Sequence, residues 1–150
     1  MNTRNLWIAA LSGAVLTTLV SNLAVINLVN CLCFAGFWGG AIFTAWLYRR
    51  LNGTLTIREG IWLGALTGLC AGLLGFVLSF LGLAGFQGMV NELAQFLPAE
   101  DMQDFATFPT WGVLLFNLLG VLTNVIFGTV GGWIGGAIFR TDRHAIVAGA

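Results

Sequence analysis

Very few side chains in this sequence belong to the types that carry out chemistry in proteins. It contains one histidine, His144, and three cysteines, Cys31, Cys33 and Cys70. A zinc site needs three or four such ligands at suitable spacing, and His144 stands far along the chain from the cysteine pair. Cys31 and Cys33 would point to opposite sides of a helix, so a disulfide between them would distort it. We expect all three cysteines to pack as small apolar side chains, with a redox or metal role as the open alternative.

Recognisable catalytic and phosphate-binding motifs do not occur. There is no G-x-S-x-G, no H-E-x-x-H and no phosphate-binding glycine loop, and the glycine-rich runs lie in apolar segments that a nucleotide could not reach. The formal net charge is zero, with no lysine and no basic cluster, which argues against a nucleic-acid partner. We therefore expect a protein that is not an enzyme and has no cofactor or metal.

The most polar side chains inside the apolar segments are three asparagines, Asn22, Asn117 and Asn124. In a helical membrane protein such an amide usually hydrogen-bonds across a helix interface, with a contribution of about 0.6 to 2 kcal/mol. The alternative is that the asparagines line a path for a small polar solute. The apolar segments hold no charged residue, which argues against proton relays, voltage sensors and ion-coupled transporters.

The composition places these residues in a membrane protein. Of the 150 residues, 58% are hydrophobic and only 8% are charged, whereas soluble domains carry about 25% charged residues. A helix needs about 20 apolar residues to cross the hydrocarbon core, and four segments are long enough. We predict an all-α, polytopic four-helix bundle forming one domain over 1–150, with spans at about 6–28, 31–48, 60–83 and 110–139.

The arginines orient these spans. Arg4 precedes the first, Arg49, Arg50 and Arg58 lie between the second and third, and Arg140 and Arg143 follow the fourth. The other two connections contain no basic residue, and the longer one carries only the acids Glu92, Glu100, Asp101 and Asp104. Because basic residues are enriched in cytoplasmic loops, we expect both termini in the cytoplasm of a bacterium and a multi-pass protein of its inner membrane.

Glycines recur every four residues in three of the spans. The series comprises Gly36 and Gly40 in the second, Gly60, Gly64, Gly68 and Gly72 in the third, and Gly128, Gly132 and Gly136 in the fourth. Four residues advance about 400° around a helix, so each series forms one slowly winding stripe. Small residues at this spacing allow helix backbones to approach closely in a membrane. The stripes therefore predict helix packing (a glycine zipper), with a glycine-lined solute path as the alternative.

Two short sequence segments each occur twice, and in the same order. LWIAALSG at 6–13 resembles IWLGALTG at 61–68, and GGAIF at 39–43 recurs at 135–139. This internal repeat indicates a duplicated helical hairpin whose two copies have the same orientation, related by an axis along the membrane normal. Chance similarity between apolar segments is the competing interpretation.

The acidic connection at about 86–109 carries apolar side chains at helical spacing. Pro98 and the acids that follow it suit the start of a helix, so two short amphipathic helices on the outer surface would account for the pattern. They would cover the helix ends or dock a partner protein. The side chains concerned are Met89, Leu93, Phe96, Met102 and Phe105.

Gly39-Gly40-Ala41 running into Leu47-Tyr48-Arg49-Arg50, then Glu59-Gly60 and the glycine series, resembles small glycine-rich four-helix bacterial membrane proteins of unknown function. The resemblance covers about residues 30–80 and implies a fold without an activity. Our leading hypothesis is a non-catalytic accessory or assembly subunit that packs through its glycine-rich faces against another membrane protein or copies of itself. The alternative is a small pore or facilitator for a small solute.

Overall fold

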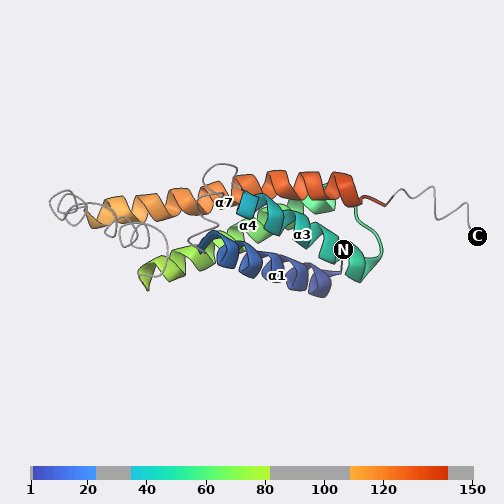
Figure 1. Cartoon of the computed structure of the whole chain (residues 1–150), viewed down its shortest axis with the longest axis horizontal. Coiled ribbons are helices and arrows are strands. Elements are labelled where there is room, and N and C mark those ends of the chain that lie inside the picture. Colours follow the sequence, from blue (N-terminus) through green and yellow to red (C-terminus); the bar gives the residue numbers. More distant parts are fainter. Residues whose placement is uncertain (1, 23–34, 82–108, 142–150) are drawn as a thin grey trace, which may run out of the picture.

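The computed structural model describes residues 2–22, 35–81 and 109–141, and nearly all of these residues lie in helices (Figure 1). The helices are α1 (Thr3–Asn22), α3 (Ala35–Asn52), α4 (Ile57–Phe80) and α7 (Thr110–Phe139), with no strand in the described residues. The all-helical prediction is confirmed for this part of the chain. Two of the helices, α4 and α7, are long and apolar enough to cross a membrane.

The helix boundaries follow local signals. The fourth predicted span coincides with α7, whereas α4 begins before the predicted 60–83 because Thr56 and Glu59 form a capping box. The Thr56 side chain accepts from the Glu59 backbone N–H, and the Glu59 carboxylate accepts from the Thr56 backbone N–H at 2.9 Å, so two otherwise unpaired backbone donors are satisfied. Helix α3 continues to Asn52 and ends at Gly53, whose φ of 76° is easily reached only by glycine.

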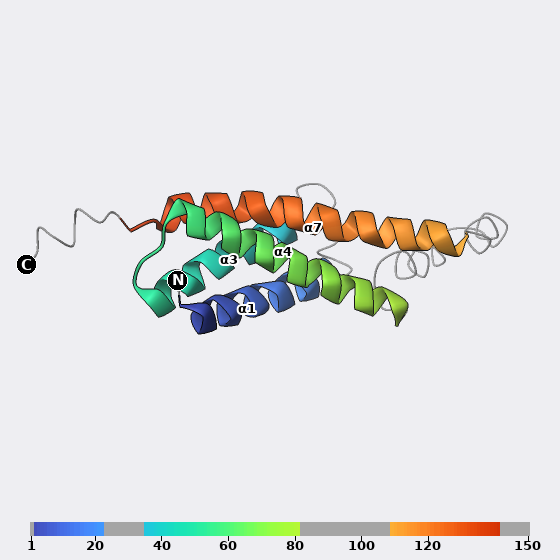
Figure 2. The ribbon, with the colours of Figure 1, turned by 180° about the vertical axis from the view of Figure 1, so that it is seen from behind.

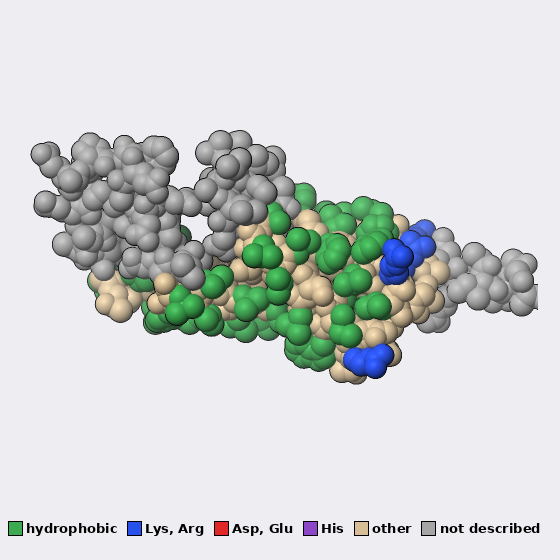
Figure 3. Space-filling model, turned by 60° about the horizontal axis from the view of Figure 1, so that its bottom comes forward, with side chains coloured by type: hydrophobic (Ala, Val, Ile, Leu, Met, Phe, Trp, Pro, Cys, Tyr) green, Lys and Arg blue, Asp and Glu red, His purple; other side chains and the backbone are tan. Residues whose placement is uncertain are grey.

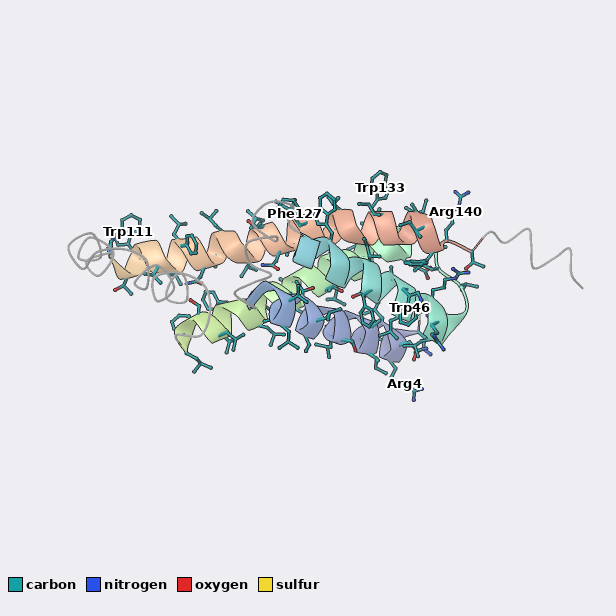
Figure 4. All side chains as sticks on the ribbon, viewed as in Figure 1. Arg4, Trp46, Trp111, Phe127, Trp133 and Arg140 are labelled. Carbon is teal, nitrogen blue, oxygen red and sulfur yellow. The ribbon has the colours of Figure 1, made fainter. Side chains whose placement is uncertain are left out.

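Consecutive helices run in opposite directions, so that α1 and α4 point one way and α3 and α7 the other (Figures 1 and 2). Hydrogen bonds fasten the end of the bundle that contains the start of α1. There the Asn5 Nδ2 donates to Asn52 Oδ1 at 2.7 Å, and the Thr141 backbone N–H donates to the Leu55 carbonyl at 3.0 Å. We call this the arginine end, since Arg4 and Arg140 both lie there (Figure 4).

Among the described residues, large apolar side chains form a core only at the arginine end. Tyr48, Leu55 and Leu63 are fully buried there together with Ala9 and Ala45. Away from this cluster, the buried positions of the described bundle are occupied by glycine, alanine, threonine, serine and one asparagine. The helices therefore stay together over most of their length through small residues, with little side-chain volume between them.

The backbones of α4 and α7 touch along their glycines. A Cβ on Gly64 would overlap the Gly128 carbonyl oxygen and lie 2.7 Å from the Cα of Gly132. Likewise, a Cβ on Gly60 would lie 2.5 Å from the Gly132 carbonyl oxygen. No side chain larger than hydrogen fits at these crossings without a shift of the backbone.

This contact has a defined end. A Cβ on Gly72 would still lie 2.9 Å from the Cα of Val121, but Gly75 and Gly120 have no atom within 4 Å of the Cβ position. Beyond Gly72 and Val121 the two helices diverge, and their far ends stand apart in both ribbon views (Figure 2).

A second glycine pair on α7 faces a different neighbour. A Cβ on Gly131 would lie 2.9 Å from the Ala41 Cβ, and one on Gly135 would lie 2.7 Å from the Ala45 Cβ. Gly131 and Gly135 are offset by one residue from Gly132 and Gly136, so they form a neighbouring stripe on the helix. One stripe of α7 thus packs against α4 and the other against α3.

The helices matched by the sequence repeat run in the same direction, but the two hairpins differ in register. Gly13 lies against Gly40, and the repeat aligns these two with Gly68 and Gly136. Gly68 instead lies against Asn124 and Gly128, about two turns from Gly136. The internal repeat stays a hypothesis of the sequence, and each hairpin has its own packing arrangement.

Replacement of Gly64 by alanine tests the α4–α7 contact. The added methyl would meet Gly128 and Gly132 backbone atoms, and such overpacking costs about 1 to 3 kcal/mol. We expect a lower melting temperature in detergent, measured by circular dichroism on the full chain.

Gly75→Ala is the matched control on the same helix, because its methyl would enter open space. It should leave the melting temperature unchanged or raise it, since alanine favours helix over glycine. Equal melting temperatures for Gly64→Ala and Gly75→Ala would contradict the backbone contact.

Candidate functional site

The two asparagines of α7 hydrogen-bond to their own helix. The buried Asn117 donates from Nδ2 to the Val113 carbonyl at 2.9 Å, and Asn124 donates from Nδ2 to the Gly120 carbonyl at 2.9 Å. The two amides are seven residues, or about 10 Å, apart along α7. Asn22 is the last residue of α1 and its side chain lies outside the description. Within the described part of the chain, these asparagines are not brought together into one site.

A buried pair of threonine hydroxyls lies where α3 and α4 meet. The Thr67 and Thr44 Oγ1 atoms are 3.1 Å apart, and both side chains are almost fully buried. Thr44 also reaches the Gly40 carbonyl at 2.9 Å, and Thr67 reaches the Leu63 carbonyl at 2.7 Å. Because each hydroxyl has only one proton, two of these three contacts can be full hydrogen bonds at one time. The bond between the helices therefore competes with the bonds inside each helix.

Thr17 completes this threonine cluster from α1. It is 3% exposed, and its hydroxyl has no partner among the described residues. The hydroxyl lies directly against Gly40, where a Cβ would overlap it, while a Cβ on Gly13 would overlap the Thr44 hydroxyl. Backbone and hydroxyl groups thus fill the crossing of α1 and α3.

The threonine cluster is suited to hydrogen bonding and packing. A threonine nucleophile requires an adjacent base, and the one carboxylate in the described ranges, Glu59, is engaged at the start of α4. Within those ranges no group of three or more histidine, cysteine or acidic side chains is placed to hold a metal ion. Cys70 is a free, partly exposed cysteine on α4.

Sequence reasoning did not single out Thr17, Thr44 or Thr67 as a site. A usable signal was present, because Gly13 precedes Thr17 by four residues and Gly40 precedes Thr44 by four. In two antiparallel helices that cross at glycine, this spacing lets each threonine cover the glycine of the other helix.

Four exposed tryptophans lie near the arginine end, and we call them the tryptophan belt; sequence reasoning did not identify it. Each helix contributes one, and each stands about one to two turns inside that end of its helix. Tryptophan is enriched where a membrane meets water. The four are Trp7 (46% exposed), Trp46 (38%), Trp62 (62%) and Trp133 (54%).

A fifth tryptophan marks the opposite end of α7. Trp111 is 69% exposed and lies far from Trp46, Arg4 and Arg140 in Figure 4. Trp111 and Trp133 are 22 residues apart, or about 33 Å along a helix, and a bilayer has a hydrocarbon core about 30 Å thick.

The surface between these two levels is apolar. Exposed leucine, valine, isoleucine and phenylalanine side chains cover the outward faces of α1, α4 and α7. On the face seen in Figure 3, the visible arginines lie toward one end, and hydrophobic side chains cover much of the described surface beside them. The described surface therefore has a long apolar zone bounded by a basic end.

Other predicted residues are only partly accounted for. Gly36 is in the first turn of α3, and its packing lies outside the description. Cys31 and Cys33, together with the surface predicted around Met89, Leu93, Phe96, Met102 and Phe105, lie outside the described residues. Comparison with protein-family models, curated proteins and solved structures gave no match.

A double-mutant cycle with Thr44→Val and Thr67→Val measures the interaction free energy between the two hydroxyls. Valine keeps the shape and removes the hydroxyl. We expect a coupling free energy of about 0.6 kcal/mol and no more than about 2 kcal/mol, as for hydrogen bonds between helices in membranes. The melting temperatures of the wild type, both single variants and the double variant in detergent provide the values.

Thr18→Val is the control, since its hydroxyl donates within α1 to the Ala14 carbonyl. It should show no coupling to Thr67→Val. Strict additivity of Thr44→Val and Thr67→Val would refute the interhelical bond.

Proposed function

We propose that this chain is a non-catalytic integral membrane protein, an accessory or assembly subunit whose four-helix bundle crosses a bacterial inner membrane. The observation that supports it best is the tryptophan belt, one exposed indole on each helix at a similar distance from the arginine end. Side chains at one level on four separate helices are the pattern that a single membrane–water boundary favours.

The lengths of α4 and α7 agree with this placement. At 1.5 Å per residue, the 24 residues of α4 and the 30 residues of α7 extend about 36 and 45 Å, more than a hydrocarbon core requires. The 20 residues of α1 and the 18 of α3 extend about 30 and 27 Å.

The arginines support a cytoplasmic location for both ends of the chain. Arg4, Arg49, Arg50, Arg58 and Arg140 all stand at or next to helix ends at the arginine end of the described bundle. Basic residues are retained on the cytoplasmic side during insertion. The connection between α3 and α4 would then face the cytoplasm, and the acidic connection before α7 would face outward.

The subunit role is supported by the surfaces that packing within the chain leaves exposed, and these are not the glycine-rich faces that the sequence suggested for partner contact. The glycine stripes of α4 and α7 are covered within the chain, so a partner would contact other surfaces. The diverging ends beyond Gly72 and Val121 and the exposed faces of α4 and α7 are available for this. A partner that stabilised the separated ends would give the protein the character of an assembly factor.

The alternative, a small pore or facilitator, receives less support from the geometry. Backbone contact seals α4 against α7 along the glycine stripe, and packed hydroxyls fill the crossing of α1 and α3. Asn117 and Asn124 have satisfied one amide donor each on α7 itself. This leaves them without the convergent arrangement that a polar solute would need.

Labelling with a membrane-impermeant maleimide tests the placement and orientation. In a chain whose natural cysteines are replaced by alanine, Gln95→Cys should react in intact spheroplasts. Thr54→Cys, at an exposed position between α3 and α4, should react only after permeabilisation. The reverse pattern would overturn the orientation, and recovery of the chain in the soluble fraction would overturn the membrane placement itself.

The subunit role is tested by crosslinking in whole membranes, followed by purification of the full chain in mild detergent. We expect a second protein, or a second copy of the chain, to co-purify. Its molar ratio to the chain should be the same at two expression levels. A monomer without any crosslinked species would contradict the role. Solute flux in liposomes that disappears on Asn124→Leu would support the pore instead.

A further inference from the structure

We infer that the surface shared by α1 and α3 binds one anionic phospholipid, with an acyl chain in an apolar groove and the phosphate beside Arg49 and Arg50. This inference rests on the proposed membrane placement. It assigns a ligand class and a position on the bundle, neither of which the subunit role specifies.

The acyl chain site is an open groove of about 570 Å³ along α1. Its lining comprises Leu11, Ser12, Val15, Leu16 and Leu19 of α1, together with Phe43 of α3. From Leu11 to Leu19 the groove follows α1 for about 12 Å. Its walls are aliphatic and aromatic, as suits a hydrocarbon chain.

The headgroup site is a second hollow of about 300 Å³, lined by Trp46, Arg49, Arg50 and Gly53. Both arginines are exposed in the last turn of α3. In the described ranges no ion pair is formed by either guanidinium, and the single carboxylate there, Glu59, is engaged with Thr56. Two guanidinium groups without a counter-charge are suited to a phosphate.

A chain of ring contacts joins the two hollows. The Phe43 ring, which lines the groove, lies 5.6 Å from the Trp46 ring, centroid to centroid. The Arg50 guanidinium in turn lies 5.6 Å from the Trp46 ring centre, within the range of a cation–π contact. The groove and the arginines therefore belong to one continuous surface, along Phe43, Trp46 and Arg50.

The order of these groups matches that of a lipid. Trp46 belongs to the tryptophan belt, at the level where headgroups meet hydrocarbon. Arg49, Arg50 and Gly53 lie beyond it toward the arginine end, whereas Val15 and Leu19 lie deeper along the bundle. Arginines in the last turn also offset the negative end of the α3 helix dipole, which accounts for the charges but not for the apolar groove, which is connected to Arg50 through Phe43 and Trp46.

The positive charge of Arg49 and Arg50 provides the selectivity for an anionic phospholipid over other lipids. Lipid tails surround the whole apolar surface, so seating one tail in the groove gains little hydrophobic free energy. Discrimination must come from the phosphate and the net negative charge of the headgroup. An arginine directly beside an anionic headgroup contributes a factor of about five in affinity, and this contribution falls off with distance from the phosphate.

Native mass spectrometry of the full chain tests the inference. The protein is extracted from vesicles of phosphatidylethanolamine and phosphatidylglycerol in a 4:1 ratio, and the retained lipids are counted. We expect one phosphatidylglycerol to be retained in preference to phosphatidylethanolamine. Arg49→Gln and Arg50→Gln should each lower its apparent affinity about fivefold, and Arg58→Gln, an exposed arginine at the same end on α4, should leave it unchanged.

The groove has its own pair of variants. Ser12→Trp should fill the groove and reduce retention, whereas Leu122→Trp on the exposed face of α7 should not. The melting temperatures of all variants verify that the bundle is intact. If the melting temperature of Ser12→Trp is lower than that of the wild type, Ser12→Leu is used instead.

Several results would overturn the site while leaving the membrane placement standing. These are equal retention of both lipids by a chain found in the membrane, an equal loss for Arg58→Gln, and full competition by soluble glycerol phosphate. Displacement of the lipid by a second copy of the chain at the groove would also overturn it. Failure of the membrane placement itself would appear earlier, as a chain that does not enter the vesicles.

Discussion

The structure depends on the contact between the backbones of α4 and α7. Glycines on both helices remove every side-chain atom from the crossing, so Gly64 lies against Gly128 and Gly132 at a distance that a methyl group would prevent. In hydrocarbon there is no hydrophobic drive to bring helices together, and close van der Waals packing takes its place. Gly131 and Gly135 form a second stripe without side chains on α7, and α3 packs against it. Helix α7 therefore contacts two neighbouring helices through glycine.

The remaining helices add to this pair by the same means. Gly13 and Gly40 bring α1 and α3 together, and the threonine hydroxyls at that crossing fill the space and connect α3 with α4. Large side chains are concentrated in the core at the arginine end and on the outer surface. This inversion, with small residues inside and large apolar residues outside, is opposite to the pattern of a soluble bundle. It agrees with the proposed placement in a bilayer.

Much of the fold was predictable because it depends on local composition. Length and apolarity gave helices at all four places, and the bounds of α7 agree with the sequence estimate. The start of α4 was missed since the capping box at Thr56 and Glu59 acts outside the apolar run. Register was not predictable, because glycines recur every four residues and sliding one stripe by a turn presents the same surface again. Gly68 therefore lies against Gly128, although the repeat aligns it with a partner at Gly136.

The site was harder to predict than the fold. Asn117 and Asn124 attracted attention as the most polar residues, yet their amides bond within α7. The groups that the structure assembles are Thr17, Thr44 and Thr67, from three helices, and four tryptophans from four helices. Their separations along the chain do not indicate proximity, and the matching spacing of Gly13 to Thr17 and of Gly40 to Thr44 becomes informative only when α1 and α3 are paired as antiparallel helices. The sequence did contain a signal for the tryptophan belt, since each of its tryptophans lies within two turns of a helix end that is next to an arginine.

Distances between α4 and α7 in liposomes test the central contact most directly. Spin labels at Leu69 and Ile126 lie beside the glycine contact, and labels at Leu81 and Leu114 lie where the helices have diverged. Double electron–electron resonance should give a clearly shorter distance for the first pair than for the second. Equal distances, or a longer distance for Leu69 and Ile126, would contradict a bundle held together by backbone contact at its glycines.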